Sequence, residues 1–259
     1  QRVRAITAFI DDVYGARRII ADGVIPADIV LGNPQFCIPC AGARPPHGVY
    51  AHICGIDLVR AGPDEFYVLE DNCRTPSGVS YMIENRDAML RLCPELFDIF
   101  PVRPVDSYPE LLRETLYSVA PDRANEPRCV LLTPGHHNSA FYEHSFLADN
   151  MGIELVEGTD LEVDDEQVFM RTIDGPVRVD VIYRRIDDAF LDPLVFRRDS
   201  LLGVPGLMAA YLAGNVSLVN APGTGIADDK AIYSYMPEIV LYYTGEDARL
   251  PNVETWRCR

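Results

Sequence analysis

Apolar side chains recur at helical intervals at the start of the chain. Ile6, Phe9, Ile10 and Val13 fall on one side of a helix when residues 2–20 are placed at about 3.6 residues per turn. Such a stripe is typical of an amphipathic helix that packs against a sheet. The sequence therefore predicts a structural helix over residues 2–20.

Strand-forming residues and a turn follow. Residues 56–60 and 66–69 are rich in residue types that favour strands, and the intervening residues 61–64 read Ala-Gly-Pro-Asp, which is typical of a turn. We therefore expect an antiparallel hairpin. The next predicted helix is capped by Ser80 and ends near Leu92. Its expected buried side comprises Met82, Met89 and Leu92.

The position of the turn sets which residues of the hairpin face each other. A turn centred on Pro63 and Asp64 places Asp57 opposite Glu70, with Asn72 two residues along the same face. A turn one residue later places Asp57 opposite Asn72. In both registers the three oxygen-bearing side chains share one face.

Opposed carboxylates on one strand face repel each other unless a positive charge lies between them. Mg²⁺ would supply that charge and prefers oxygen ligands, so Asp57, Glu70 and Asn72 are candidate metal ligands. The alternative is a solvated strand face on which the acids coincide. Arg74 and Ser77 leave the second strand beside this face, and such side chains suit an anionic substrate.

Helices and strands alternate from about residue 108 onward. The expected order is helix 108–119, strand 129–133, helix 138–150 and strand 153–156. This alternation predicts a parallel, three-layer α/β unit, and residues 101–107 mark a candidate boundary before it. Further strands are expected at 161–163, 168–171, 177–183 and 216–219, and a further helix at 203–213.

The turn at residues 133–139 joins a predicted strand to a predicted helix, which is where α/β sheets bind ligands. A plain turn with Asn138 or Ser139 as the helix N-cap is the alternative. His136, His137 and His144 lack the HExxH spacing of zinc hydrolases, so we predict no transition-metal site from them.

Two arginines end the strand predicted at 177–183. Arg184 and Arg185 can hold a phosphate or a carboxylate through paired hydrogen bonds, or they can form salt bridges with Asp187 and Asp188. Both interpretations remain open from the sequence.

Lys230 is the only lysine among 23 basic residues. It follows a glycine-containing turn and begins a helix that is predicted to run to about Tyr243, with Asp228 as the N-cap. An ammonium group near a helix start can hold a nucleotide phosphate, although GxxxxGK[ST] is not met. A surface lysine paired with Asp229 is the alternative.

The composition is that of a globular protein, 48% hydrophobic and 24% charged. A net charge of −16 disfavours nucleic acid and anionic membranes as partners, and no run of 18 apolar residues occurs. Seven scattered cysteines indicate a reducing, cytoplasmic location. Cys37 and Cys40 have CxxC spacing, but a structural zinc needs a second pair, so we interpret the spacing as coincidence.

Five segments of the chain resemble one known family. They are GIDLVR, YVLEDNCRTPSGVSYMIENR, LLTPGHHNSAFYEHSFLADNMGIELVEGTDL, VDVIYRRIDDAFLDPL and VNAPGTGIADDKAIYSYMPEIV. In this order, and through nearly the whole chain, they resemble the circularly permuted ATP-grasp proteins (type 2), which are related to the synthetase domain of glutathionylspermidine synthase.

This resemblance implies an α/β fold of the circularly permuted ATP-grasp type with an inserted, pre-ATP-grasp-like three-layer α/β unit. Residues 1–100 would form the ATP-grasp part that carries the Mg²⁺-binding hairpin. Residues 101–200 would form the inserted unit, and residues 201–259 the start of the nucleotide-binding part.

The resemblance also implies site residues and cofactors. Asp57, Glu70 and Asn72 match the Mg²⁺ ligands of the family, and Lys230 matches the first of its two ATP-binding lysines. The implied cofactors are therefore ATP and Mg²⁺.

The implied reaction joins a small-molecule or peptide carboxylate to an amine. ATP would phosphorylate the carboxylate, and the amine would attack the resulting acylphosphate to form an amide. Arg74 and Ser77 match the turn that faces the substrate carboxylate and the transferred phosphoryl group, and Arg184 and Arg185 would absorb developing negative charge.

Two features depart from the family. Gly55 stands where the glutathionylspermidine enzymes carry an arginine, which argues against glutathione as the substrate. The second ATP-binding lysine and the glycine-rich loop of the family would follow Arg259, so we interpret the chain as an interior fragment that is inactive alone. Glu143 and Asp188 are candidate bases. A non-catalytic nucleotide-binding protein and a structural or interaction protein are the alternative functions.

Overall fold

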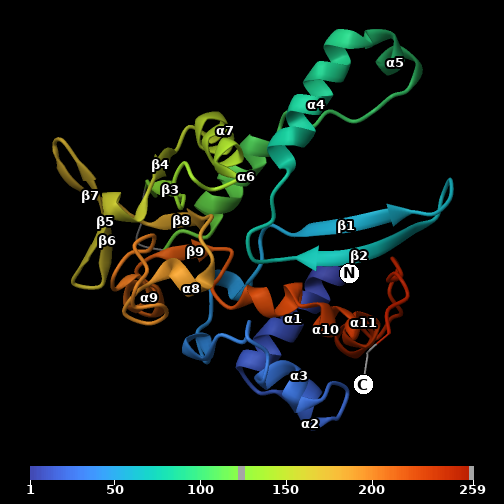
Figure 1. Ribbon diagram of the computed structural model, residues 1–259, viewed down its shortest axis with the longest axis horizontal. Coiled ribbons are helices and arrows are strands. Elements are labelled where there is room, and N and C mark those ends of the chain that lie inside the picture. The colour runs from blue at the N-terminus through green and yellow to red at the C-terminus, as the bar shows by residue number, and fades with distance from the viewer. Residues whose placement is uncertain (122–125, 257–259) are drawn as a thin grey trace. The chain divides into compact units, whose positions relative to one another are not determined.

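A computed structural model describes residues 1–121 and 126–256 (Figure 1). The chain divides into two compact units: residues 1–76 with 217–259, and residues 77–216. The described residues form helices and three sheets, so the predicted mixed α/β fold is confirmed. The division into three domains at residues 100 and 200 stays a prediction.

The first unit consists of short helices and one β-hairpin. Its α-helices are α1 (Arg2–Tyr14), α2 (Arg18–Ala21), α3 (Ala27–Leu31), α10 (Lys230–Tyr233) and α11 (Met236–Thr244). Its strands are β1 (Gly55–Arg60), β2 (Phe66–Asn72) and β9 (Ser217–Val219), and its 3₁₀ helices are η1 (Ile38–Cys40), η2 (Pro46–Gly48) and η4 (Thr224–Asp228). α1 packs against α11 and η4, which joins the two separate stretches of chain into one unit.

The helix predicted over residues 2–20 is two helices. α1 buries its apolar stripe completely, as the spacing predicts. It ends at Tyr14 with Gly15 as its C-cap, and Arg17 adopts a left-handed φ of 57° directly before α2. The Asp12 carboxylate accepts hydrogen bonds from the backbone N–H groups of Arg18 (2.9 Å) and Ile19 (2.8 Å), which satisfies the open start of α2.

The second unit contains a parallel sheet, an antiparallel sheet and a helical arm. Its α-helices are α4 (Val79–Leu92), α5 (Pro94–Ile99), α6 (Tyr108–Ser118), α7 (Phe141–Met151), α8 (Asp188–Leu191) and α9 (Leu207–Leu212), and η3 (Gly158–Asp160) is a 3₁₀ helix. Its strands are β3 (Cys129–Leu132), β4 (Glu154–Val156), β5 (Leu161–Asp164), β6 (Gln167–Thr172), β7 (Gly175–Val179) and β8 (Val181–Arg184).

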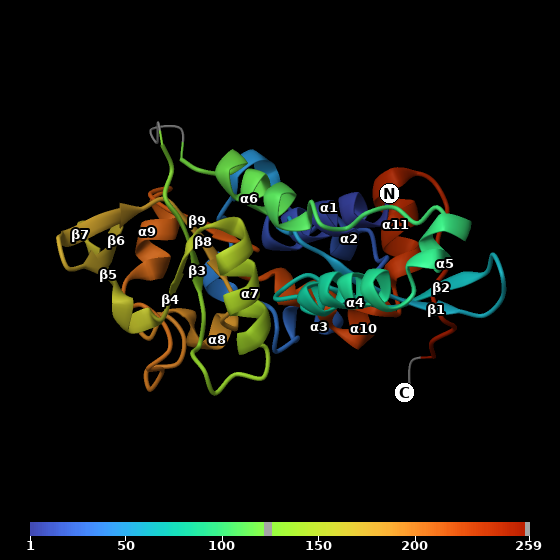
Figure 2. The same cartoon turned by 90° about the horizontal axis from the view of Figure 1, so that it is seen from above.

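The parallel pairing predicted for this unit is confirmed. β3 pairs in parallel with β4 on one side and β8 on the other, and every residue of β3 and β8 is buried. α6 packs against β8, α7 packs against β3, and the two helices pack against each other (Figure 2). The strand predicted at 177–183 is split at Asp180, whose carboxylate accepts a hydrogen bond from the Arg128 N–H at 3.0 Å.

α4 and α5 form an arm of the second unit (Figure 1). The buried side predicted for α4 is wrong, because Met82, Met89 and Leu92 are 42%, 37% and 77% exposed. Only Ser80 and Ile83 are buried in α4, whose packing partners are α7 and α5. Ser80 does not cap the helix, which begins one residue earlier, after Gly78.

None of the helices formed by residues 1–121 and 126–256 combines the length and the apolar character that crossing a membrane requires.

Candidate functional site

β1 and β2 pair in the first of the two predicted registers. Asp57 lies opposite Glu70, and Gly55 lies opposite Asn72. A β-bulge directly after Asp57 shifts the pairs nearer the turn by one residue. Since residues two apart on a strand share a face, Asp57, Glu70 and Asn72 lie together on one side of the hairpin.

Lys230 reaches the same face from the start of α10. Its ammonium group forms an ion pair with the Glu70 carboxylate and donates a hydrogen bond to the Leu69 carbonyl at 3.3 Å. It also lies 5.5 Å from the centre of the Tyr233 ring. Lys230 is therefore paired with Glu70, and not with Asp229 as the alternative interpretation had it.

The charges of this cluster shift the two carboxyl groups in opposite directions. Hydrogen bonding to Lys230, together with its charge, holds the pKa of Glu70 below its usual value, and Asp57 and Asn72 also hydrogen-bond to Glu70. Burial, followed by the contact with Glu70, raises the pKa of Asp57. Two carboxylates and an amide thus converge where one cation balances only part of the negative charge, and this donor set fits Mg²⁺.

The prediction that Asp228 caps the helix of Lys230 is wrong. Asp229 is the N-cap, and its carboxylate accepts hydrogen bonds from the N–H groups of Ala231 (2.8 Å) and Ile232 (3.2 Å). The helix predicted to run to about Tyr243 is also divided into α10 and α11. The Asp229 cap ends the 3₁₀ turn and starts α10 at Lys230 itself.

Asp228 instead fastens the turn to the end of β2. Its carboxylate accepts hydrogen bonds from the N–H groups of Cys73 (2.5 Å) and Arg74 (3.3 Å). The Arg74 guanidinium donates a hydrogen bond to Gln35 at 3.1 Å. Gly225 leaves room for this arginine, since an added Cβ there would lie 3.2 Å from Arg74 Cδ. Arg74 is thereby held between the glycine turn and the segment before η1.

Asn220 positions the two chain segments that flank the hairpin, which the sequence reasoning missed. Its amide oxygen accepts hydrogen bonds from the N–H groups of His52 (2.9 Å) and Ile53 (3.0 Å). Its amide nitrogen donates to the carbonyls of Ile53 and Cys73, both at 2.7 Å. An Asn side chain can donate two hydrogen bonds and accept two, which suits it to these four contacts. The available signal in the sequence was an Asn directly before Ala-Pro-Gly.

The other predicted catalytic residues lie in the second unit. Arg184 is fully buried, pairs with Asp188 at 2.6 Å and donates to the Ile186 carbonyl at 2.9 Å. Arg185 is buried and pairs with Glu143 at 3.2 Å. Ser77 is exposed. The predicted salt bridge with Asp188 is therefore present for Arg184. The catalytic role of Arg184, Arg185 and Ser77 stays a prediction.

Glu143 is saturated by hydrogen bonds, which the sequence did not indicate. One carboxylate oxygen accepts from the Gly78 N–H (2.7 Å), the Ser80 N–H (3.1 Å) and the Ser80 hydroxyl (2.9 Å), and the other pairs with Arg185. Glu143 thus supplies the missing cap of α4 from a neighbouring helix.

A small cavity lies beside the turn after β3. The cavity beside it measures about 20 Å³, which holds about one water molecule. His144 is buried, and its Nδ1 lies 2.8 Å from Thr133 Oγ1. Burial, and then the charge of Arg185, lower the pKa of His144 to about 4. Asn138 closes a turn by accepting from the Ala140 N–H at 2.8 Å, and it does not cap α7.

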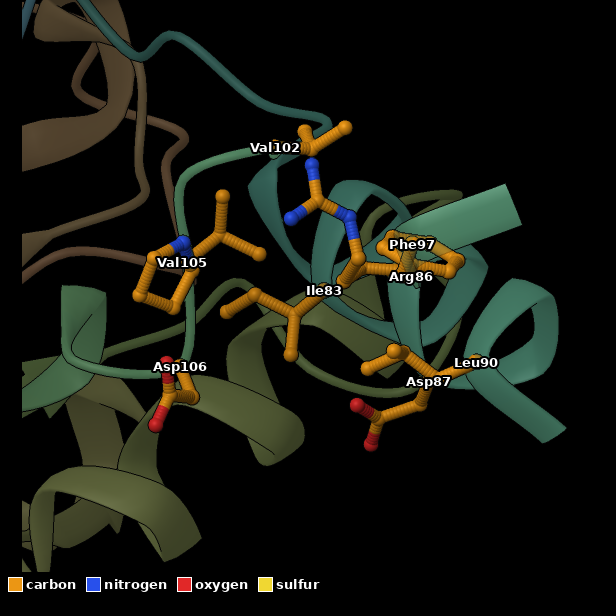
Figure 3. A pocket seen from close by; sticks show the side chains of 9 residues that line it. Ile83, Arg86, Asp87, Leu90, Phe97, Val102, Val105 and Asp106 are labelled. Atoms are coloured by element: carbon orange, nitrogen blue, oxygen red, sulfur yellow. The ribbon is translucent and has the colours of Figure 1, made fainter. Parts of the chain in front are cut away.

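A cavity of about 440 Å³ opens on the arm of α4 and α5 (Figure 3). Its apolar walls include Ile83, Leu90, Phe97, Val102 and Val105. Arg86 lies 5.5 Å from the centre of the Phe97 ring and donates to the Arg103 carbonyl at 2.6 Å. None of the predicted site residues lines this cavity.

Within the described part of the chain, no three His, Cys, Asp or Glu side chains are grouped for metal binding. The candidate set on the hairpin consists of two carboxylates and the Asn72 amide.

Comparison with known proteins decides the family. The family model for circularly permuted ATP-grasp type 2 matches residues 1–259. The chain belongs to this ATP-grasp family. The resemblance inferred from the five sequence segments is thereby confirmed.

The sequences of several relatives align with the whole of this chain. It is 55% identical over 258 residues to an uncharacterized protein of Synechocystis sp., covering 54% of that relative, and 53% identical over 258 residues to one of Mycobacterium tuberculosis, covering 47%. It is 43% identical over 263 residues to a Frankia casuarinae protein named "Putative glutamate--cysteine ligase 2-2", covering 30% of it. The chain thus spans about half the length of the Synechocystis and Mycobacterium relatives.

Proposed function

We propose that the protein to which this ATP-grasp chain belongs is an ATP-dependent carboxylate–amine ligase that works through an acylphosphate. The observation that carries the proposal is the convergence of Asp57, Glu70, Asn72 and Lys230 on one face of the β1–β2 hairpin. The name of the Frankia relative supports the same class of reaction.

In this proposal Asp57, Glu70 and Asn72 hold Mg²⁺. The bound ion would neutralise the phosphate oxygens of ATP and help them accept charge. Lys230 binds a nucleotide phosphate. Because its ammonium group pairs with Glu70 in the structure, Lys230 and a bound cation compete for the same carboxylate, and a cation there frees the ammonium group for phosphate.

Arg74 is the residue best placed to bind the substrate carboxylate. It follows β2 directly, and Gln35 and Asp228 limit its freedom. A guanidinium that is already oriented loses little entropy on binding an anion. Ser77, on the same turn of sequence, would contact the transferred phosphoryl group. A charge-absorbing role for Arg184 and Arg185 requires that their ion pairs open.

Gly55 argues for a substrate other than glutathione. A Cβ at this position would lie 2.9 Å from Pro76 Cβ, so a longer side chain cannot enter without moving the turn after β2. The arginine that the glutathionylspermidine enzymes carry there has no space in this chain. We propose a small-molecule or peptide carboxylate and an amine as substrates, and a cytoplasmic location.

The test uses the full-length protein with Mg²⁺, ATP and a panel of carboxylates that begins with glutamate. Hydroxylamine serves as the amine, because it converts any acylphosphate into a stable hydroxamate. We expect carboxylate-dependent release of ADP and hydroxamate, both lost in Glu70→Gln and Asn72→Ala. Asp64→Asn, in the exposed hairpin turn, is the matched control.

If these two variants release ADP and hydroxamate as fast as the parent, the hairpin is not the metal site. If ATP binds in a Mg²⁺-dependent manner but no carboxylate yields ADP, the result favours a non-catalytic nucleotide-binding member of the family.

A further inference from the structure

The two cysteines of the CxxC segment lie in direct contact. Cys37 Sγ and Cys40 Sγ lie 2.7 Å apart. Both residues are thiols that form no disulfide, and they are 8% and 3% exposed. From the sequence we interpreted the CxxC spacing as coincidence. In the structure it brings the two sulfur atoms together.

The backbone holds this pair in place. The Cys40 N–H donates to the Cys37 carbonyl at 2.9 Å, and the Ala41 N–H donates to the Ile38 carbonyl at 3.0 Å, which closes the turn of η1. The Cys37 N–H donates to the Tyr14 hydroxyl at 2.9 Å. These hydrogen bonds fix the backbone from which both cysteine side chains extend.

Tyr14 is itself fixed from two sides. Its hydroxyl donates to the Gly223 carbonyl at 3.0 Å, and its ring stacks on Phe36 with centres 4.9 Å apart. Gly223 is required there, since a Cβ would lie 2.8 Å from the Tyr14 hydroxyl. The CxxC turn is thus tied to the same glycine segment that leads to Lys230.

A second cysteine pair of this unit offers an internal comparison. Cys54 and Cys73 flank the hairpin, and their sulfur atoms are 3.9 Å apart. Each pair alone supplies only half of a tetrahedral zinc site. Within the described residues the cysteines of the CxxC turn have no third His, Cys, Asp or Glu grouped with them for a metal. Thiol chemistry is therefore the activity that fits the CxxC pair.

We propose that Cys37 and Cys40 form a redox-active dithiol that small-molecule disulfides oxidise to an intramolecular disulfide. This proposal does not depend on the ligase function. It rests on the distance between the sulfur atoms and on the hydrogen bonds that hold the CxxC turn.

The reaction has two exchange steps. The thiolate of Cys37, the more exposed of the two, attacks one sulfur of the small disulfide, forms a mixed disulfide and releases one small thiolate. The thiolate of Cys40 then attacks the Cys37 sulfur, which forms the Cys37–Cys40 bond and releases the second small thiolate. The two protein thiols lose two electrons and two protons, and the small disulfide takes up both as two thiols.

Proximity makes the second step faster than the first. Once Cys37 carries an adduct, Cys40 is already within contact distance, and intramolecular attack avoids the entropic cost of bringing two groups together. The disulfide, and not the mixed adduct, is the expected product.

The test equilibrates the purified full-length protein with mixtures of 2-mercaptoethanol and its disulfide. Acid then stops exchange, and alkylation with peptide mass spectrometry locates each thiol. We expect a Cys37–Cys40 disulfide, seen as the loss of two hydrogens, with an equilibrium constant for closure at least about tenfold above that of Cys54 with Cys73. Cys93 in the second unit remains available for alkylation in the same sample.

Variants separate the two steps. In Cys40→Ser the mixed disulfide with 2-mercaptoethanol accumulates on Cys37, because the second sulfur is missing. Cys93→Ser is the matched control and leaves the disulfide unchanged. Circular dichroism checks that each variant is folded.

Two outcomes overturn the proposal. In one, Cys37 and Cys40 both take up the alkylating reagent in mixtures that convert Cys93 to its mixed disulfide. In the other, Cys37 or Cys40 joins a different cysteine of the chain.

Discussion

Arg2 donates two hydrogen bonds to the Asp71 carboxylate, from Nε to Oδ1 at 2.7 Å and from Nη2 to Oδ2 at 2.6 Å. Asp71 lies between Glu70 and Asn72 in β2, so its side chain points to the opposite face of the hairpin. The ion pair on one face therefore fixes which way the candidate metal ligands on the other face are presented.

Replacing Arg2 with Ala should lower the free energy of unfolding by about 3–5 kcal/mol, because Asp71 would remain as an unpaired buried charge. Urea denaturation followed by circular dichroism measures the change. Arg4→Ala, on the exposed side of the same helix, is the matched control and should change stability by less than about 0.5 kcal/mol. Equal losses in the two variants would show that the ion pair does not hold the hairpin.

Lys230→Met should weaken ATP binding at least about tenfold, equivalent to about 1.4 kcal/mol, if its ammonium group holds a phosphate. Isothermal titration of the full-length protein with ATP and Mg²⁺ measures the affinity. Arg249→Met removes an exposed cation from the same unit and should leave it unchanged. An unchanged affinity in Lys230→Met would remove this lysine from the nucleotide site.

Gly55→Ala should destabilise the first unit by about 1–3 kcal/mol, because the new Cβ would lie 2.9 Å from Pro76 Cβ. Gly62→Ala is the control, since its Cβ would meet only the flexible Glu65 side chain at 3.2 Å. Thermal unfolding compares the two. If Gly55→Ala is as stable as the parent, the turn after β2 can move and the steric argument against an arginine at this position fails.

Glu143→Gln should cost about 3–5 kcal/mol of stability, since buried Arg185 would lose the carboxylate with which it pairs. Hydrogen exchange at the first turn of α4 should also become faster, because the Gly78 and Ser80 N–H groups lose a charged acceptor. Glu114→Gln, on the exposed side of α6, is the matched control. Exchange in α4 that does not respond to Glu143→Gln would contradict this capping role.

Stability should fall as the pH drops below about 6.5, the usual pKa of histidine. Burial lowers the pKa of folded His144 to about 4, so between these values the unfolded chain binds a proton that the folded chain does not. The accumulated loss is roughly 3 kcal/mol by about pH 4. Urea denaturation across this range measures it.

His144→Gln should flatten this part of the pH profile, because the titrating group is gone. His136→Gln, at an exposed position, should leave the profile unchanged. A profile that keeps its slope in His144→Gln would assign the loss of stability to other groups.

The sequence predicted the elements whose pattern is local. The apolar stripe of α1, the two strands of the hairpin and the alternation of β3, α7 and β4 are properties of short segments, and the structure contains each of them. The sequence patterns failed where a side chain outside an element determines where that element begins or ends. Asp12 starts a second helix within the predicted first one, and Asp228 turns away from its helix toward Cys73.

The same division applies to the candidate site. Turn chemistry and the strand period placed Asp57, Glu70 and Asn72 on one face, because register in a hairpin is a local property. Lys230 lies 160 residues beyond Glu70 in the chain, so its position against Glu70 depends on how η4 and α10 pack on β2. The contact between Cys37 and Cys40 depends likewise on a hydroxyl from α1.

The sequence by itself determined the family, the hairpin and the shared face of Asp57, Glu70 and Asn72, since each follows from residue type and short-range spacing. The tertiary structure alone decided that Lys230 neutralises Glu70, that Arg2 holds the reverse face through Asp71, and that Glu143 caps a helix other than its own. The physical reason is that charges and hydrogen bonds act through space, and distance in space is fixed only when the chain has packed.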